Sequence, residues 1–175
     1  PAPDAPGSKQ VTALMTITGL IDAPKADKEF LSINGAQGFS TFYGYYMLEA
    51  MAMAGNYQGA LDVIREYWGA MIDLGATSFW EDFDINWIPN AAPIDELVPE
   101  GKKDIHGDCG AYCYVGFRHS LCHGWASGPT SWLSRHILGV EVIEPGCRQV
   151  RITPHLGDLQ WVKGTFPTPY GELQI

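Results

Sequence analysis

Basic residues are scarce in this sequence of 175 residues. Lys and Arg together number 11 against 20 Asp and Glu, so the formal net charge is −9. A protein that follows nucleic-acid phosphates needs the opposite balance, and we expect no nucleic-acid partner. No stretch approaches the ~18 uninterrupted apolar residues of a membrane-spanning helix, so we expect no membrane span. The composition, 46% hydrophobic and 18% charged, excludes a wholly disordered chain.

Cysteine is also rare, and the four present are too few for a disulfide scaffold. No G-x-G-x-x-G joins a strand to a helix and no G-x-S-x-G is present, so we expect no cofactor and no serine-hydrolase elbow. The first residues, PAPDAPGSKQ, lack the basic and apolar regions of a signal peptide. The last residues, GELQI, fall inside a strand-like pattern, and we expect the chain to be part of a larger protein. The compartment is not determined, although a periplasmic or extracellular location is favoured over a cytoplasmic one.

Apolar residues recur at helical spacing in several parts of the chain. The pattern predicts helices over 9–20, 23–31, 40–54, 56–75 and 127–139, with glycines near most of their ends. The third and fourth helices are separated by a very short link, which predicts an antiparallel helical hairpin. Between the fourth helix and the fifth, regular periodicity fails over about fifty residues rich in Trp and His. A long irregular segment inside a compact domain is usually functional.

An aromatic run comprises Phe42, Tyr43, Tyr45 and Tyr46. Its helical spacing predicts that these rings belong to the buried core, although one Tyr can still face a pocket.

After Gly139 the pattern changes from helical spacing to short strands. Strands are predicted over 140–143, 149–152, 159–165 and 172–175, separated by turns that contain Pro and Gly. Helices followed by strands predict two domains with a boundary near Gly139. The expected fold class is therefore mainly α with a C-terminal β segment.

An acidic and aromatic cluster follows the fourth helix, in GATSFWEDFDINW. It contains Trp80, Glu81, Asp82, Asp84 and Trp87. Burial beside indole rings and the proximity of other carboxylates both raise a carboxyl pKa, so Glu81 is a candidate general acid or base. The alternative is an acidic helix end with aromatic packing. A calcium loop is excluded because Trp87 stands where such a loop needs Gly.

A second cluster combines His and Cys. Only five residues separate its second Cys from its second His, too few for a zinc finger, so we predict no metal and interpret the cysteines as small buried side chains. His123, beside Trp125, is either a buried hydrogen-bonded histidine or a partner for a polar ligand. The members of the cluster are His106, Cys109, Cys113, His119, Cys122 and His123.

Three segments share an order of motifs with a known family. Residues 38–84, GFSTFYGYYMLEAMAMAGNYQGALDVIREYWGAMIDLGATSFWEDFD, are similar to a helix pair followed by a G-A-T-T-x-W-E loop. Residues 120–140, SLCHGWASGPTSWLSRHILGV, are similar to an S-x-x-H helix entry. Residues 144–175 contain the turn motifs P-G, I-x-P and T-P-Y-G. In this order the segments resemble the bacterial α-L-rhamnosidases of glycoside hydrolase family 78.

The resemblance implies an (α/α)6 toroid with a sugar site at its mouth, followed by a small β-sandwich. Residues 1–138 would be the last helical hairpins and active-site loops of the toroid, and residues 139–175 the beginning of the sandwich. Glu81 matches the family's general base, and His123 matches a histidine that contacts rhamnose. The remaining implied site residues are the pocket walls Trp80, Trp87 and Trp125 and the supporting carboxylates Asp82 and Asp84.

The implied function is a fragment of an inverting glycoside hydrolase that removes terminal α-L-rhamnose from glycans or glycosides. Such an enzyme needs a base to activate water and an acid, roughly 6.5–9.5 Å away, to protonate the leaving group. The family's acid lies well upstream, and nothing in this chain matches it. We therefore expect a carbohydrate substrate, the remainder of the catalytic domain as a partner, and no activity from the chain alone.

The chain departs from the family pattern at two places. Asp82, Phe83 and Asp84 stand where the family often has a basic residue and Trp, and His123 lies in C-H-G-W instead of H-Y-x-x-G. These departures leave the sugar open. A related toroid hydrolase acting on another sugar and a non-catalytic carbohydrate-binding or interaction module remain alternatives.

Overall fold

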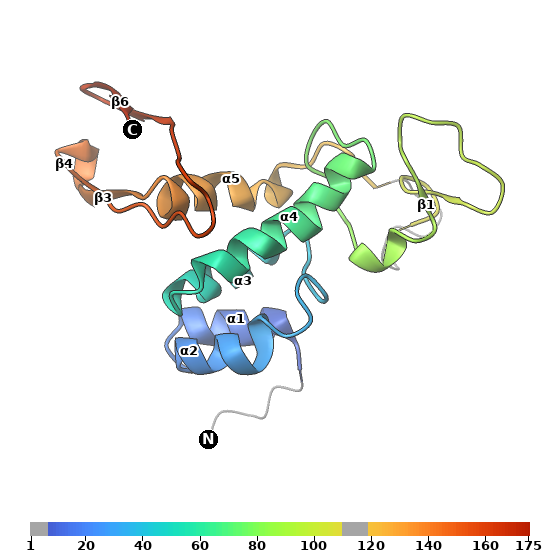
Figure 1. The fold of residues 1–175 in the computed structure, drawn as a ribbon, viewed down its shortest axis with the longest axis horizontal. Helices are drawn as coiled ribbons and strands as arrows, with labels where there is room; N and C mark the ends of the chain where they lie inside the picture. Colours follow the sequence, from blue (N-terminus) through green and yellow to red (C-terminus); the bar gives the residue numbers. More distant parts are fainter. Residues whose placement is uncertain (1–6, 110–118) are drawn as a thin grey trace.

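The computed structural model describes residues 7–109 and 119–175. Helices fill most of its first part, and short antiparallel hairpins form its last part (Figure 1). This confirms a mainly α fold with a C-terminal β segment. None of the helices in the described ranges is long and apolar enough to cross a bilayer.

The helices agree closely with the predicted ranges. Both the second and the fifth predicted helix begin as α-helix and continue into a π-helical turn, η1 (Asp27–Leu31) and η5 (Leu133–Ile137) respectively. The five α-helices are α1 (Lys9–Ile17), α2 (Ala23–Ala26), α3 (Gly44–Met53), α4 (Tyr57–Asp73) and α5 (Gly128–Trp132).

Helix α3 lies at the centre, because it contacts α1, α2, α4 and α5. Helix α4 runs diagonally beside it, with α1 and α2 on one side and α5 with the C-terminal hairpins on the other (Figure 1). Three residues connect α3 to α4, and Asn56 caps α4 by accepting a hydrogen bond from Gly59 N at 2.9 Å.

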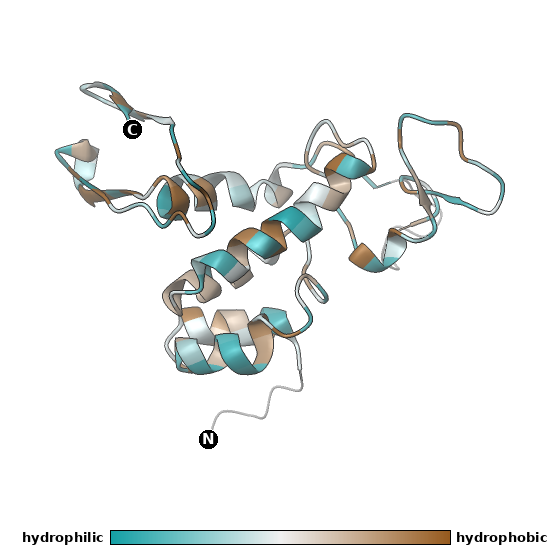
Figure 2. Ribbon diagram, viewed as in Figure 1, coloured by the Kyte–Doolittle hydropathy of each residue, from teal (hydrophilic) through white to brown (hydrophobic). Residues whose placement is uncertain are grey.

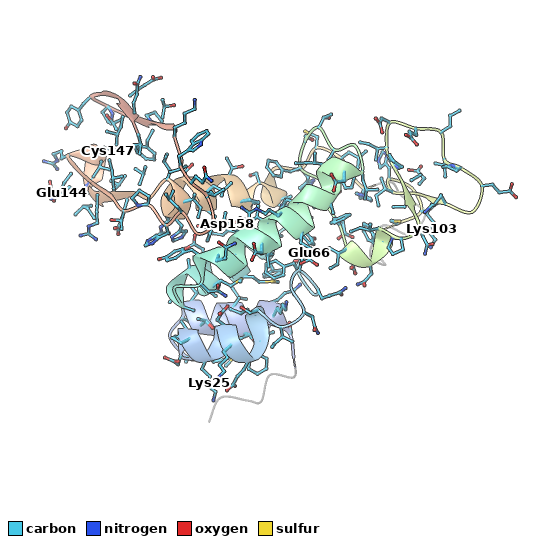
Figure 3. All side chains as sticks on the ribbon, in the orientation of Figure 1. Lys25, Glu66, Lys103, Glu144, Cys147 and Asp158 are labelled. Atoms are coloured by element: carbon cyan, nitrogen blue, oxygen red, sulfur yellow. The ribbon has the colours of Figure 1, made fainter. Side chains whose placement is uncertain are left out.

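Helix α4 is amphipathic, and hydrophilic and hydrophobic residues alternate around it in Figure 2. Its apolar side buries Leu61, Trp68 and Met71 in the core. Its polar side ties distant segments to the helix. Arg65 forms a salt bridge with Asp158 at 2.8 Å, and Glu66 accepts a hydrogen bond from Ala36 N at 2.9 Å. Figure 3 labels Glu66 and Asp158 along the two sides of α4.

The predicted third helix begins four residues late, at Gly44. Residues 41–43 form a turn, because the Thr41 hydroxyl donates a hydrogen bond to the Glu81 carbonyl at 2.5 Å. Gly44 packs against the Trp68 ring so closely that a Cβ there would lie 2.7 Å from it.

The prediction that the aromatic run is buried is wrong. Phe42 is 40% exposed and Tyr43 36% exposed, and Tyr45 and Tyr46 are half-buried. Two of the four rings precede the helix, so helical periodicity does not govern them. The buried side chains of α3 are instead Met47, Leu48, Ala50, Met51 and Ala52.

The strands occur in three two-stranded sheets among the described residues. The first is a short parallel pair that lies between α4 and α5 in the sequence. The other two are antiparallel hairpins after Gly139. The strands are β1 (Ala91–Ala92), β2 (Lys103–Asp104), β3 (Val140–Glu144), β4 (Gln149–Ile152), β5 (Thr165–Thr168) and β6 (Gly171–Gln174).

The strand predicted over 159–165 is wrong except for its last residue. Leu159 and Val162 both pack against the helical core, and their spacing of three does not suit an alternating strand. The β5–β6 hairpin therefore starts later, at Thr165, although Gly164 and Ile175 still exchange backbone hydrogen bonds of 3.0 Å.

Gly139 joins the helical part to the first hairpin. Its φ is +79°, and a Cβ on it would lie 2.2 Å from the carbonyl carbon of Thr153. The Gly139 carbonyl also accepts a hydrogen bond from Thr153 N at 2.8 Å. Only glycine allows the two backbones to approach this closely in this conformation.

We predict that Gly139→Ala lowers the free energy of unfolding by about 3 kcal/mol or more, because it combines left-handed strain with a backbone clash. Gly146→Ala is the matched control, since Gly146 has a φ of +73° and nothing within 4 Å of the added Cβ. It should cost only about 1–2 kcal/mol. Urea denaturation of both variants measures the difference, and equal losses would show that the close approach contributes nothing.

Candidate active site

Two irregular segments, 78–81 and 120–123, lie side by side and are joined by hydrogen bonds. Glu81 N donates to Ser120 O at 2.8 Å, and His123 N donates to Phe79 O at 2.7 Å. The Ser78 hydroxyl donates to Leu121 O at 2.6 Å. The two segments are 39 or more positions apart in sequence, and these bonds bring Glu81 and His123 together.

The Glu81 carboxylate lies between the two segments. Its Oε2 accepts a hydrogen bond from Ser120 N at 2.7 Å. Its Oε1 lies 3.9 Å from His123 Nδ1, and the two side chains are 17% and 32% exposed. The backbone donor fixes the position of the carboxylate, and both side chains keep contact with solvent.

The main chain of Glu81 is held as firmly as its carboxylate. Its carbonyl accepts hydrogen bonds from the Thr41 hydroxyl at 2.5 Å and from Trp125 Nε1 at 2.9 Å. Thr41 comes from the turn before α3, and Trp125 from the short 3-10 helix η4 (Gly124–Ala126). Two other parts of the chain, the turn before α3 and the segment 120–125, therefore converge on Glu81.

The three predicted pocket tryptophans occupy different surroundings. Trp125 is 44% exposed, and its ring centroid lies 4.1 Å from that of His123. Trp80 is fully buried and packs against Phe83. Trp87 is half-buried and contacts Phe83 as well. Of the three, Trp125 is the one whose ring lies against His123.

Asp82 and Asp84, which follow Glu81, interact with neighbouring groups of the fold. Asp84 Oδ1 accepts a hydrogen bond from Asn86 N at 2.9 Å and so caps the 3-10 helix η2 (Ile85–Trp87). Asp82 is half-buried. Burial raises the pKa of the Tyr67 hydroxyl, and the Asp82 and Asp84 carboxylates raise it further. Tyr67 therefore remains a neutral donor.

The His and Cys cluster is only partly described, because Cys113 lies outside the described residues. His119 is fully buried, and burial lowers its pKa. Cys109 packs at the edge of the core, but Cys122 is exposed, so the prediction of a buried side chain is wrong for Cys122. Within the described ranges, no three His, Cys, Asp or Glu side chains are grouped to hold a metal ion.

Sequence reasoning missed Thr41 and Ser120. Both hold Glu81, one through a hydroxyl and one through a backbone N–H. A single Ser or Thr carries no distinctive pattern, and a backbone donor is independent of residue type. The only available signal was the S-x-x-H motif, in which Ser120 precedes His123 by three positions.

Comparisons with known proteins find relatives of the C-terminal segment and of the fold. Residues 139–175 match the model of the bacterial alpha-L-rhamnosidase C-terminal domain. The whole fold is similar to the crystal structure of the GH78 family rhamnosidase of Bacillus sp. GL1, with a TM-score of 0.68 and 27% identity. That match covers 95% of this chain and 16% of the rhamnosidase. No curated protein matches significantly.

Both the matched domain model and the matched structure belong to glycoside hydrolases of the rhamnosidase type. The predicted resemblance to the bacterial α-L-rhamnosidases of glycoside hydrolase family 78 is thereby confirmed. The chain spans about 16% of the length of the solved rhamnosidase.

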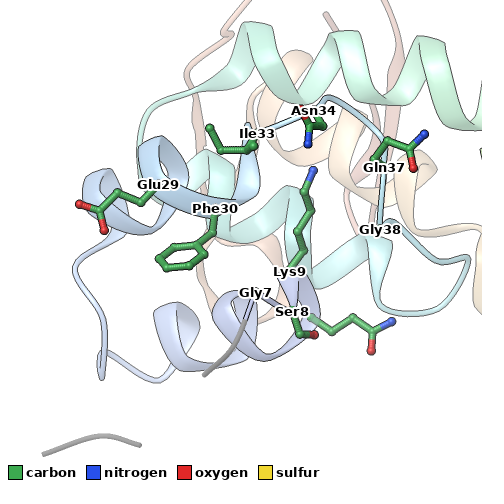
Figure 4. A pocket seen from close by; sticks show the side chains of 10 residues that line it. Gly7, Ser8, Lys9, Glu29, Phe30, Ile33, Asn34, Gln37 and Gly38 are labelled. Atoms are coloured by element: carbon green, nitrogen blue, oxygen red, sulfur yellow. The ribbon is translucent and has the colours of Figure 1, made fainter. Parts of the chain in front are cut away.

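A separate cavity of about 520 Å³ lies between α1 and the segment after η1. In Figure 4 the Lys9 side chain extends from α1 toward Asn34 at its wall. Lys9 Nζ donates to Gly35 O at 2.6 Å and lies 5.2 Å from the Phe39 ring centroid. Burial lowers the Lys9 pKa to about 8, although the Glu66 carboxylate opposes this.

Lys9 should make stability depend on pH in a defined window. Between pH 8 and 10.5 the unfolded chain holds a proton that the folded chain releases, so stability rises with pH by on the order of 1–3 kcal/mol. We predict that Lys9→Met removes this rise. Denaturation curves at pH 7.5 and 10 measure it, with the exposed Lys25→Met as control. If the free energy of unfolding of Lys9→Met still rose with pH as in the unaltered protein, the rise would not come from Lys9.

Proposed function

We propose that this chain supplies the general base and part of the sugar site of an inverting glycoside hydrolase that cleaves terminal α-L-rhamnosides. The observation that carries the proposal is the Glu81–His123 pair, 3.9 Å apart and partly open to solvent. The two residues match the family's base and its rhamnose-contacting histidine, and the matched relative is a rhamnosidase.

In this proposal residues 1–138 form the last hairpins and active-site loops of an (α/α)6 toroid. Residues 139–175 begin the C-terminal β-sandwich, and the matched C-terminal domain model covers the same residues. The chain spans only a small part of the solved relative. The remaining toroid would therefore come from the rest of the protein, and the chain alone would not hydrolyse substrate.

The chemistry assigned to Glu81 is general-base catalysis. Its carboxylate takes a proton from a water molecule, and that water attacks the anomeric carbon from the face opposite the leaving group. A carboxylic acid from the rest of the protein protonates the leaving oxygen, roughly 6.5–9.5 Å away. The Ser120 N–H, the Thr41 hydroxyl and the Trp125 indole hold Glu81 in place during the proton transfer.

His123 and Trp125 are assigned to the sugar. The His123 imidazole can hydrogen-bond a sugar hydroxyl beside Glu81, while its ring rests against the indole of Trp125 at 4.1 Å. Trp80, Trp87, Asp82 and Asp84 would shape and support the loop that carries Glu81. The convergence of a carboxylate and a histidine favours a hydrolase over a non-catalytic carbohydrate-binding module.

We predict that Glu81→Gln lowers kcat by about 10²–10⁴ and changes KM little in the full-length protein that contains this chain. Gln keeps an oxygen that accepts from Ser120 N but cannot take a proton from water. Glu66→Gln is the matched control, because Glu66 also accepts from a backbone N–H but lies on α4. Hydrolysis of p-nitrophenyl α-L-rhamnoside measures both. Near wild-type kcat in Glu81→Gln would transfer the role to Asp82 or Asp84.

His123→Ala should behave differently, with KM raised by about tenfold, because a hydrogen bond to the sugar is lost in the ground state as well. The control is His155→Ala, since His155 stacks on Tyr57 at the start of α4 at 3.8 Å between ring centroids. The same assay gives both constants. A loss confined to kcat, with KM unchanged, would exclude a sugar-binding role for His123.

A further inference from the structure

The cavity between α1 and the segment after η1 is not used by the proposed function. We call it the Lys9 cavity, and its walls come from the first turn of α1, the end of η1 and the segment 33–38. None of the residues that line it belongs to the proposed sugar site. Its volume of about 520 Å³ lies within the usual range for small-ligand pockets. Figure 4 shows the cavity from close by.

Lys9 places a buried ammonium group at the wall of this cavity. The residue is 9% exposed, and within the described part of the chain its Nζ donates one hydrogen bond, to Gly35 O at 2.6 Å. An ammonium carries three donors, and a buried charge costs free energy unless it is paired. The Phe39 ring, 5.2 Å from Nζ, attracts the cation but carries no net charge. The ammonium therefore retains the capacity to hold an anion.

Two carboxylates of the protein face Lys9 without pairing with it. Glu66 of α4 attracts the ammonium, but its Oε2 accepts a hydrogen bond from Ala36 N at 2.9 Å. Glu29 of η1 lines the cavity, and in Figure 4 its side chain extends away from Lys9. Among the described residues, neither carboxylate forms a salt bridge with Lys9, so the position beside the ammonium is open to the carboxylate of a ligand.

The other walls combine apolar surface with an amide. Phe30 and Ile33 supply the apolar part, and Ile33 is 49% exposed. Asn34 supplies an amide that can donate to an anion, and the Lys9 side chain points toward it in Figure 4. A cation and an amide beside an apolar surface match a carboxylate that is attached to an apolar body.

The charged cluster near Gly139 provides a contrast. Arg135 lies 3.5 Å from the Glu49 carboxylate, and Arg151 lies 3.1 Å from the Glu141 carboxylate. Each of these cations already has a carboxylate of the protein as its partner, and both side chains are more than half exposed. Lys9 differs because it is buried and faces a cavity.

We propose that the Lys9 cavity binds a small monocarboxylic acid as its anion, with the carboxylate on Lys9 and Asn34 and the apolar body against Phe30 and Ile33. This inference goes beyond the proposed function and does not depend on it. A single carboxylate is the best match, because the cavity offers one cation and the nearby Glu66 would repel a second negative charge.

The test is isothermal titration calorimetry of the full-length protein with benzoate and with benzamide, its uncharged isostere. Benzoate should bind with a Kd of about 1 mM or tighter, and benzamide at least about tenfold more weakly, because only benzoate forms a charge-assisted hydrogen bond with Lys9. Lys9→Met should weaken benzoate binding by about tenfold or more and leave benzamide binding unchanged. Lys25→Met, at an exposed lysine, is the matched control and should bind both probes normally.

Three results of this titration would overturn the proposal. Equal binding of benzoate and benzamide would make the cavity a purely apolar pocket. Unchanged benzoate binding in Lys9→Met would place the anion elsewhere. Competition between benzoate and free L-rhamnose would place the anion at the Glu81 site. If Lys9→Met does not fold, the comparison of benzoate with benzamide in the unaltered protein still decides the point.

The pH dependence of benzoate binding gives a second readout. Burial lowers the pKa of Lys9 to about 8, so its protonated fraction falls from about nine-tenths at pH 7 to about one-tenth at pH 9. Benzoate affinity should therefore fall by about tenfold over this range. Lys9→Arg keeps its charge at both pH values, and its benzoate affinity should stay constant. An equal fall in Lys9→Arg would assign the pH dependence to Glu29 or Glu66 and overturn the role of Lys9.

Discussion

Two consecutive residues of α4 hold the candidate site together. The Tyr67 hydroxyl donates to Phe83 O at 2.5 Å, and Trp68 Nε1 donates to Ala126 O at 3.0 Å. Phe83 follows Glu81 by two positions, and Ala126 follows His123 by three. Two adjacent buried side chains of α4, Tyr67 and Trp68, thus position the two loops that carry Glu81 and His123.

The hydrogen bonds from Tyr67 and Trp68 matter because the backbone of both loops is irregular. Outside a helix or sheet, buried carbonyls need other donors, and an unpaired one costs about 1–3 kcal/mol. Tyr67 and Trp68 supply such donors from the core, while Ser120 and Glu81 pair with each other at the surface. Because Tyr67 is buried and its pKa is raised, it donates across the whole physiological pH range.

The sequence predicted the features that depend on repetition. Apolar spacing located the five α-helices of the described residues, since a helix that packs on a core must repeat its contacts along one face. It failed for Phe42 and for 159–164, where single contacts outweigh any pattern. The Glu81–His123 pairing had no periodic signal at all, and only the resemblance to a known family indicated it. Thr41 stayed hidden because its role depends on the distant Glu81 carbonyl.

A second Glu–His pair shows why Glu81 stands out from other carboxylates. Glu49 and His136 lie 3.1 Å apart, at direct hydrogen-bond distance, and Arg135 lies 3.5 Å from the same carboxylate. Both partners are about 15% exposed, and the pair fastens α3 to η5. Glu81 and His123 lie 3.9 Å apart, beyond direct hydrogen-bond distance, and His123 is twice as exposed as His136. Glu49 and His136 bond directly to each other, and this pair serves packing. In the second pair, the more exposed His123 imidazole is able to contact a ligand. The Ser120 N–H meanwhile keeps the Glu81 carboxylate in place.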